Sequence, residues 1–516
     1  MTFNILKRHF LRLLMAFILL GGFHGLASAS PRWTDPNPKR EFRGAWLHVI
    51  GQSQYQDMGT NKAKMYIQDQ LDKLQAAGCN AVIFQVRPTA DALYKSDLEP
   101  WSAWLTGKRG RAPQPEWDPL EFTLQEAHNR GMEFHAWLNP YRVTSNGKEV
   151  LPSTHDIHKH PERYVKFNGQ TFFDPAYQEN RDFICDVVAD IVSRYDVDAI
   201  HIDDYFYPYP ANGQRFENDN ASYAKFGKGM ERRAWRRKNV DLLIEQLHST
   251  IKETKPWVRF GVSPFGIWRN KKSDARGSNS NGLQNYDDLY ADVLLWAEKG
   301  WIDYLAPQLY WSLDMAAAPS RHLAEWWNDH TPENVQLYIG QDTKRTMDSA
   351  DPKNRDTNEL DTKVRLSRKL HNVDGNVWWH GYWVTGNYKG VADSLATKYQ
   401  RTIALPPVWG DERVKPERIK NLEVQRYDGK TFLEWVPPVN GKTERAEDAV
   451  MFVVYSFLPG ENTDDLSDAE TIIAVTPFSR VVISDDESPE SVKGMTFAVT
   501  SLDRQNREST PVKIKL

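Results

Sequence analysis

The chain repeats one pattern eight times: a short, mostly apolar run predicts a strand, and an amphipathic segment after it predicts a helix. The predicted strands are residues 43–50, 81–87, 133–139, 199–203, 259–264, 304–310, 336–341 and 376–380. Several of these runs are continuously apolar, as expected of parallel strands that are buried on both faces. Eight successive strand–helix units indicate an α/β fold of the closed (β/α)8 TIM-barrel type, with an open doubly wound sheet as the alternative.

The composition changes around residues 404–416, where several prolines interrupt the helical pattern. Beyond this point the helical periodicity disappears, and Asp428-Gly429 lies between two strand-like runs, which is a strong signal for a β-hairpin. We therefore expect a barrel domain over residues 30–405, a linker over 406–416, and a small all-β domain over 417–516 that resembles a fibronectin type III sandwich.

Residues 1–29 have the pattern of a secretory signal peptide, with basic residues, an apolar core and the small-residue segment Ala27-Ser28-Ala29. The apolar core is too short for a stable membrane span, although an uncleaved anchor is the alternative. We expect an exported protein, periplasmic or extracellular after cleavage, without stable membrane insertion. The formal net charge of −4 gives no indication of a nucleic-acid partner.

The chain has two cysteines. Cys79 precedes a predicted strand, and Cys185 lies on the apolar side of a predicted helix. Two separate buried thiols are expected from these positions rather than a disulfide framework. Four histidines approach the predicted barrel interior, but no strand carries the His-x-His pair of metal-dependent hydrolase barrels. We expect neither a metal nor another cofactor. These histidines are His48, His135, His201 and His380.

A barrel of this kind carries its chemistry at the carboxyl ends of its strands. The segment 199–207 runs from an apolar strand directly into two carboxylates, Asp203 and Asp204, which three aromatic residues follow. Burying such charges without partners is costly, so the pair indicates acid catalysis on a sugar. The other strand ends carry polar and aromatic side chains, which we expect to bind the sugar. The candidates are Arg87, Asn139, Tyr141, Arg142, His201, Tyr205, Trp268, Arg269, Asn270, Gln308, Tyr310, Trp311 and Asp342.

The sequence leaves the second catalytic group open. Strand alternation directs Asp203 toward the barrel axis and Asp204 elsewhere, unless the backbone leaves sheet geometry after Asp203. A two-carboxylate mechanism can also draw on Asp91, Asp314 or Asp342. In a substrate-assisted mechanism, by contrast, the sugar's own 2-acetamido group attacks, and an adjacent carboxylate pair suffices. That mechanism requires an N-acetylated sugar.

Six segments at or near the predicted strand ends resemble the bacterial glycosyl-hydrolase-like family 10. The matching segments are residues 42–46, 85–88, 135–142, 203–207, 261–270 and 306–311. They occur in the family's order and extend the resemblance over about residues 40–400. The segment Gln341-Asp342-Thr343-Lys344 departs from the family pattern at the seventh strand, which leaves the precise glycan open.

The resemblance implies a (β/α)8 barrel, export to the cell envelope, and cleavage of peptidoglycan strands that lack stem peptides. It also implies a central role for the two adjacent aspartates. We therefore expect a glycoside hydrolase for an N-acetylated cell-wall glycan, with Asp203 as the main catalytic carboxylate and Asp204 as the general acid/base. The alternatives are a glycosidase for a dietary or environmental polysaccharide and a non-catalytic glycan-binding protein.

Overall fold

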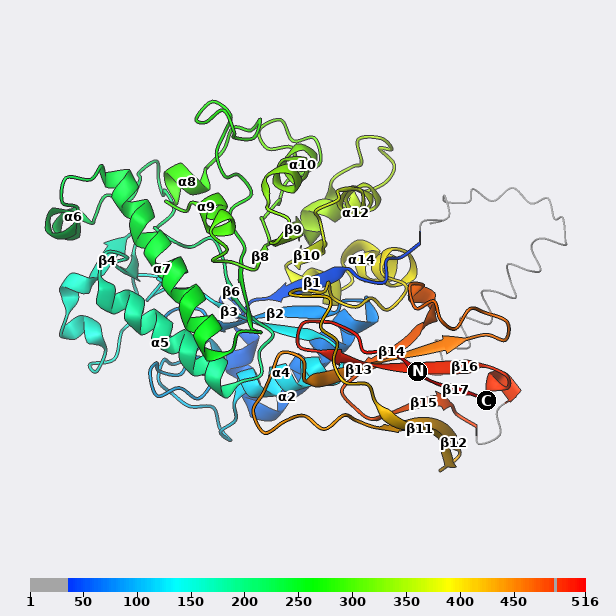
Figure 1. Cartoon of the computed structure of the whole chain (residues 1–516). Helices are drawn as coiled ribbons and strands as arrows, with labels where there is room; N and C mark the ends of the chain where they lie inside the picture. Colours follow the sequence, from blue (N-terminus) through cyan, green and yellow to red (C-terminus); the bar gives the residue numbers. More distant parts are fainter. Residues whose placement is uncertain (1–35, 487–489) are drawn as a thin grey trace.

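The structure is a computed structural model that describes residues 36–486 and 490–516, so the predicted signal peptide lies outside the described residues. Figure 1 shows a barrel, coloured blue to yellow, with a β-domain in orange and red packed against it. Eight parallel strands close the barrel in the order β1-β10-β9-β8-β7-β6-β3-β2. They are β1 (Phe42–Leu47), β2 (Ala81–Arg87), β3 (Glu133–Leu138), β6 (Ala199–Ile202), β7 (Arg259–Val262), β8 (Tyr304–Leu305), β9 (Gln336–Asp342) and β10 (Gly375–Trp379).

All eight predicted strands are present, and the predicted TIM barrel is confirmed. The sixth, β8, covers only two residues, although the apolar pattern predicts a strand up to Tyr310. Pro307 has no N–H to donate, so the regular ladder stops there. Gln308 still forms isolated bridges to Phe265 and Gly340, which keeps this segment at the barrel rim.

Helices surround the barrel and cover its outer face (Figure 1). The longer ones are α2 (Gln54–Ala76), α4 (Pro119–Asn129), α5 (Gln178–Arg194), α7 (Arg232–Thr254), α10 (Ser320–His330) and α12 (Leu360–Lys369). The shorter ones are α3 (Ala103–Thr106), α6 (Asn220–Phe226), α8 (Asn285–Asp288), α9 (Val293–Glu298), α11 (Thr343–Asp348), α13 (Gly381–Thr385) and α14 (Val391–Ser394). The long segment after β3 contains a hairpin of β4 (Tyr164–Phe167) and β5 (Gln170–Phe173), which the sequence patterns did not predict.

Two apolar cores stabilise the barrel domain. The larger one lies between strands and helices, where buried residues such as Leu71, Leu124 and Leu247 meet outward-facing strand residues. The smaller one fills the barrel itself with aromatic side chains. Within it, the rings of Phe42 and Tyr338 stack with centroids 3.9 Å apart. A barrel interior filled in this way is a solid support for a site at its end.

The C-terminal domain is all-β, as predicted. One sheet contains β11 (Lys420–Tyr427), β12 (Lys430–Val436) and β15 (Arg480–Ser484). The other sheet contains β14 (Ile472–Thr476), β13 (Ala449–Phe457), β16 (Thr496–Asp503) and β17 (Val512–Lys515). The predicted hairpin at Asp428-Gly429 joins β11 and β12, and both turn residues have positive φ. Trp435, Phe452 and Phe497 from the two sheets share one buried core, so the domain is a β-sandwich.

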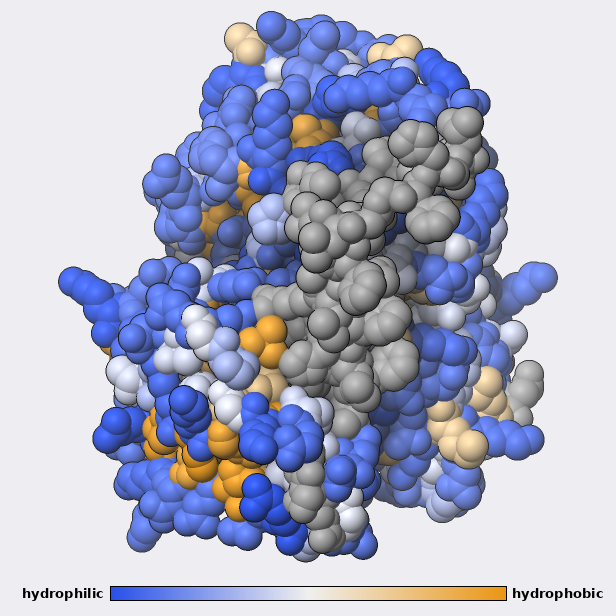
Figure 2. Space-filling model, turned by 90° about the vertical axis from the view of Figure 1, so that its right-hand side faces the viewer, coloured by the Kyte–Doolittle hydropathy of each residue, from blue (hydrophilic) through white to orange (hydrophobic). Residues whose placement is uncertain are grey.

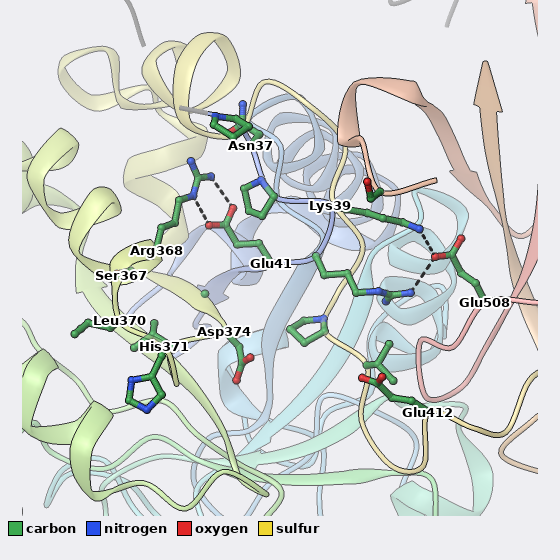
Figure 3. Close-up of a pocket in the computed structure, with 18 of the residues that line it drawn as sticks. Asn37, Lys39, Glu41, Ser367, Arg368, Leu370, His371, Asp374, Glu412 and Glu508 are labelled. Carbon is green, nitrogen blue, oxygen red and sulfur yellow. Dashed lines mark hydrogen bonds and ion pairs between the residues drawn. The ribbon is translucent and has the colours of Figure 1, made fainter. Parts of the chain in front are cut away.

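The sandwich contacts the barrel at the amino-terminal ends of its strands. Gln336, the first residue of β9, donates to the carbonyl of Val408 in the linker over 3.1 Å. Beside this contact the described residues line an open cavity of about 1030 Å³ between the two domains. Figure 3 shows Lys39 paired with Glu508 of the sandwich in this cavity, and Glu41 paired with Arg368. The sandwich therefore lies at the end of the barrel opposite to the strand carboxyl ends.

The described part of the surface is mostly polar (Figure 2). Figure 2 shows a mostly hydrophilic face with apolar residues in a few small areas. Within residues 36–486 and 490–516, no helix is both long and apolar enough to cross a bilayer. Cys79 and Cys185 are both buried and unpaired, at separate places in the barrel domain.

Candidate active site

A cavity of about 400 Å³ opens at the carboxyl ends of the barrel strands. The lining side chains come from several different strand ends, as is typical of active sites in this fold. They are Trp46, His48, Ile50, Gln85, Trp137, Arg142, Asp203, Asp204, Tyr205, Tyr209, Ser263, Phe265, Gln308, Tyr310 and Trp379. Both adjacent aspartates that the sequence singled out therefore face one cavity.

The backbone explains how two consecutive aspartates reach the same space. Strand β6 ends at Ile202, and the chain bends at Asp204. The Phe206 N–H donates to the Asp204 carbonyl over 3.2 Å, which closes a tight turn. The alternation of a strand no longer applies beyond Ile202, so Asp204 is free to turn toward the cavity together with Asp203.

Both carboxyl groups are about 5% exposed and share a low-dielectric site. Burial, followed by the charge of Asp204, raises the pKa of Asp203 to about 7. Burial also raises the pKa of Asp204 to about 6, against the opposing effect of a hydrogen bond from Tyr209. Since each charge disfavours the other, the pair titrates near pH 6 to 7 and holds one proton between its two steps.

Each aspartate has its own donor. The Trp137 Nε1–H donates to Asp203 Oδ2 over 3.1 Å, and the Tyr209 hydroxyl donates to Asp204 Oδ2. Arg142 contributes a positive charge that lowers the pKa of both carboxyl groups. Its guanidinium lies 4.5 Å from the ring centroid of Tyr205, and its Nε donates to the Pro88 carbonyl. These contacts fix the orientation of the pair before any ligand binds.

Aromatic rings form much of the cavity wall. Tyr310 and Trp379 stack with centroids 6.1 Å apart and planes 10° apart. Trp379 also meets Trp137 edge-on at 6.1 Å and Trp46 edge-on at 6.3 Å. Flat aromatic faces beside hydrogen-bonding groups suit a sugar ring, which has an apolar face and polar edges.

Among the described residues that line the cavity, Asp203 and Asp204 are the only carboxylates. The other acids that the sequence offered lie elsewhere. Asp91 is fully buried and accepts from Thr89, Asp314 pairs with Arg321 at 3.6 Å, and Asp342 caps helix α11 through the Arg345 N–H. None of these three aspartates lines the cavity, so acid or base catalysis by a carboxyl group of the described lining falls to Asp203 and Asp204.

Four of the predicted binding residues lie around the carboxyl ends of β2 and β3. Arg142 lines the cavity, whereas Arg87 is buried in an ion pair with Glu99, with Nη2 and Oε1 2.6 Å apart. Asn139 accepts the Arg142 N–H within the loop, and Tyr141 is buried. Arg87, Asn139 and Tyr141 support the loops around the cavity and are not part of its lining.

The predicted residues after β7 also lie outside the cavity lining. Trp268 is buried and stacks on Trp326, with centroids 6.0 Å apart. Arg269 pairs with Asp274 and Asp287, both at 2.8 Å. Asn270 accepts the Gly282 N–H and donates to the Gly282 carbonyl, which ties the loop after it.

Of the remaining predicted binding residues, Tyr205, Gln308 and Tyr310 line the cavity. Trp311 contacts Phe265 edge-on at 5.4 Å behind the wall. His201 lies below the cavity floor, fully buried between Trp46 and Tyr304.

Sequence reasoning missed several lining residues, most notably Tyr209, Trp46, Trp137 and Trp379. The three tryptophans lie in strands, at or next to their carboxyl ends, so their position in the pattern was a usable signal. Tyr209 follows Asp204 by five residues in an irregular loop, and no periodicity indicates where such a side chain points.

Two further observations concern groups that could hold a metal ion. Burial and the neighbouring His380 lower the pKa of His48 in the cavity wall to about 4, so its imidazole is neutral at neutral pH. Its Nε2 lies 2.7 Å from Gln52 Nε2. Over the described ranges, no group of three or more His, Cys, Asp or Glu side chains has the geometry to hold a metal ion.

Comparisons with known proteins agree with this arrangement. The family described as glycosyl hydrolase-like 10 matches residues 41–357. The chain is 36% identical over 497 residues to Glycosyl hydrolase YngK of Bacillus subtilis (strain 168), covering 94% of each protein. It is 41% identical over 336 residues to Glycosyl hydrolase DigH of Escherichia coli (strain K12), covering 61% of this chain and 76% of that protein.

A solved structure shows a distant likeness in fold. The PgaB (BpsB) glycoside hydrolase domain from Bordetella bronchiseptica aligns with a TM-score of 0.45 and 10% identity, over 69% of this chain and 98% of that chain.

Proposed function

The chain belongs to the glycosyl hydrolase-like 10 family and is a glycoside hydrolase, and we propose that it cleaves an N-acetylated cell-wall glycan. The preferred substrate in this proposal is a peptidoglycan strand that lacks stem peptides. The observation that carries the proposal is the adjacent pair Asp203–Asp204, which supplies the only carboxylates among the described residues of an aromatic-walled cavity.

An adjacent pair suits a substrate-assisted mechanism. In that reaction the carbonyl oxygen of the sugar's 2-acetamido group attacks the anomeric carbon while the bond to the leaving oxygen breaks. One aspartate, as a carboxylate, orients the amide N–H and stabilises its developing positive charge. The other, as a carboxylic acid, protonates the leaving oxygen and then takes a proton from the water that opens the cyclic intermediate. A pair that shares one proton near neutral pH has both forms available.

Arg142 supports the preference for strands without stem peptides. Muramic acid carries a lactyl carboxylate, which is free in a peptide-free strand and becomes a neutral amide where a stem peptide is attached. A guanidinium pairs well with a carboxylate and loses that charge–charge contact with an amide. Arg142 is the arginine that lines the described part of the cavity, so it is our candidate for this contact.

Release of reducing ends tests the proposal directly. Peptide-free peptidoglycan strands are incubated with wild type, Asp203→Asn and Asp204→Asn, beside the same strands after chemical N-deacetylation. We expect release by wild type on acetylated strands, a loss of about 10³-fold or more in either variant, and no release from deacetylated strands. Equal activity of wild type and both variants overturns the catalytic assignment. Activity only on another polysaccharide, or binding without cleavage, overturns the substrate or the reaction.

The proposal extends to the location of the protein. A cell-wall substrate requires export, and residues 1–29 have the signal-peptide pattern. We also propose that the C-terminal sandwich is of the fibronectin type III kind, supported by its sheets of three and four antiparallel strands. N-terminal sequencing of the mature protein from cell fractions tests the predicted cleavage after Ala29.

A further inference from the structure

A continuous row of hydrogen-bonded side chains runs down the barrel axis from the cavity floor. Trp46 Nε1 lies 3.1 Å from His201 Nε2, and His201 Nδ1 lies 2.9 Å from the Tyr304 hydroxyl. The same hydroxyl lies 2.8 Å from His135 Nδ1, and His135 Nε2 lies 3.1 Å from Glu133 Oε2. All five residues are buried, and we call them the polar column.

The chemistry of its first member fixes the direction of every hydrogen bond in the column. The indole Nε1–H of Trp46 can only donate, so His201 Nε2 must accept and carries no proton. His201 is neutral, because burial lowers its pKa far below the ordinary value. Its one proton is therefore on Nδ1 and is donated to the Tyr304 oxygen.

The direction continues to the lower end of the barrel. The Tyr304 hydroxyl already accepts from His201, so its own proton goes to His135 Nδ1. His135 is neutral too, because burial lowers its pKa, and its proton is on Nε2, where it is donated to Glu133. Arg259 Nη2 also approaches His135 Nε2, at 3.3 Å, but it lies 2.5 Å from Glu133 Oε2 and donates there instead.

The lower end of the column is held by the other domain. Asn506, in the turn after β16, donates from Nδ2 to Glu133 Oε1 over 2.8 Å and to the Pro407 carbonyl over 3.2 Å. Three donors, Arg259, His135 and Asn506, thereby surround the Glu133 carboxylate. Burial raises the pKa of Glu133, but the positive charge of Arg259 and the hydrogen bonds from His135 and Arg259 outweigh burial and lower that pKa below its ordinary value. A buried carboxylate with this set of partners is a rigid anchor.

The position of the central tyrosine depends on a glycine in the neighbouring strand. A Cβ at Gly261 on β7 would overlap the Tyr304 ring, so the absence of a side chain there makes the space for the ring. Tyr304 is fully buried and does not line the cavity. Its role in the column is thus separate from contact with a substrate.

We propose that the polar column is a positioning device: it holds the Trp46 indole in the cavity floor through a chain of fixed polarity, and the sandwich domain holds its lower end through Asn506. The Trp46 N–H is bonded to His201 below the cavity floor, so only the ring of Trp46 is available to contact a sugar. The sandwich, although it lies at the far end of the barrel, thereby contributes to the shape of the site. The inference rests on the proposed function only for its kinetic readout.

Nitrogen NMR of the full chain labelled with ¹⁵N-histidine and ¹⁵N-tryptophan tests the column without any substrate. Between pH 6 and 8 we expect His201 to be protonated only on Nδ1 and His135 only on Nε2. A proton on His201 Nε2 is incompatible with donation by the Trp46 N–H. Its detection in the wild-type protein is enough to overturn the proposal, independently of any variant.

Three variants test the coupling along the column. Tyr304→Phe removes the central hydroxyl and should shift the Trp46 indole signal and release the fixed tautomers of both histidines. Tyr207→Phe is the matched control, because it removes another buried hydroxyl, which accepts from Asn239 and lies outside the column. Asn506→Ala should shift the His135 signals. Unchanged Trp46 and histidine signals in Tyr304→Phe overturn the column, and unchanged His135 signals in Asn506→Ala overturn the role of the sandwich.

Kinetics supply the functional readout. A displaced Trp46 should raise KM for peptide-free strands about tenfold in Tyr304→Phe with a smaller change in kcat, while Tyr207→Phe keeps the wild-type KM. A wild-type KM in Tyr304→Phe overturns the positioning role. If the wild type releases no reducing ends at all, the proposed function fails. The NMR measurement of the His201 and His135 tautomers still tests the polar column in that case, because it needs no substrate.

Discussion

The Tyr209 hydroxyl donates a hydrogen bond to Asp204 Oδ2 inside the cavity, from a position five residues further along the loop. This bond favours the charged form of Asp204 and opposes the effect of burial on its pKa. It is the clearest difference between the two aspartates, because Asp203 takes its donor from the strand β3 residue Trp137.

Loss of this bond should change the pH dependence of catalysis. In Tyr209→Phe the pKa of Asp204, about 6 in the wild type, rises further because the charged form loses its donor. Since the reaction needs one member of the pair ionised, the acidic limb of the kcat/KM profile should move up by about one pH unit. Tyr207→Phe, which removes a buried hydroxyl bonded to Asn239, is the control and should leave the profile unchanged. The same profile in all three proteins would contradict the role of Tyr209.

The buried pair should also make stability depend on pH. The folded-state pKa values of Asp203 and Asp204 are about 7 and 6, above the ordinary value of 3.8. The folded state therefore binds more protons than the unfolded state, and this contribution to stability is present below about pH 4 and lost as the pH rises through 6 to 7.

Asp203→Asn removes the group with the larger shift and should thus gain stability relative to wild type as the pH rises. Thermal unfolding at pH 5, 6, 7 and 8 measures the difference in Tm between the two proteins. Each pKa unit corresponds to about 1.4 kcal/mol, so the trend is large enough to resolve. A difference that stays constant over this pH range would show that the pair is not destabilised by burial.

Sequence reasoning predicted the barrel because a repeated strand–helix pattern depends on local hydrophobic periodicity, which every unit displays separately. It also located the two aspartates of the cavity, because charged groups at the end of a buried strand are costly to the fold and so point to chemistry. It could not place residues such as Arg87 and Trp268, because a side chain at a strand end can face a neighbouring helix or loop as readily as the cavity. Glu99, the partner that holds Arg87 away from the cavity, lies twelve residues away in an irregular loop, and no pattern links the two.

The ion pair of Arg87 and Glu99 supplies a stability prediction. Their side chains are 0% and 2% exposed, and two hydrogen bonds of 2.6 and 2.7 Å join them. Glu99→Gln keeps the shape but leaves a buried guanidinium without its counter-ion, which should cost about 3 kcal/mol in the free energy of unfolding. Asp69→Asn breaks an exposed pair with Lys73 and should cost less than about 1 kcal/mol.

The same variant tests the location of Arg87. Because this arginine lies outside the cavity lining, Glu99→Gln should retain the wild-type KM at a temperature where both proteins are folded. Urea unfolding and reducing-end kinetics on the same preparation give the two quantities. A raised KM with unchanged stability would instead assign Arg87 to substrate binding.

The stacked pair of Tyr310 and Trp379 should bind the sugar face. Their rings lie 6.1 Å apart and nearly parallel, and both line the cavity. Trp379→Ala removes one ring and leaves the other without support, so KM should rise about tenfold, which corresponds to about 1.4 kcal/mol of lost binding. Trp379→Phe retains a flat ring and should lie between the wild type and the alanine variant. Trp268→Phe alters a tryptophan that is buried against Trp326 outside the cavity, and it should lower Tm without raising KM. Equal KM values for Trp379→Ala and Trp268→Phe would mean that the stacked pair supports the fold and does not contact the glycan.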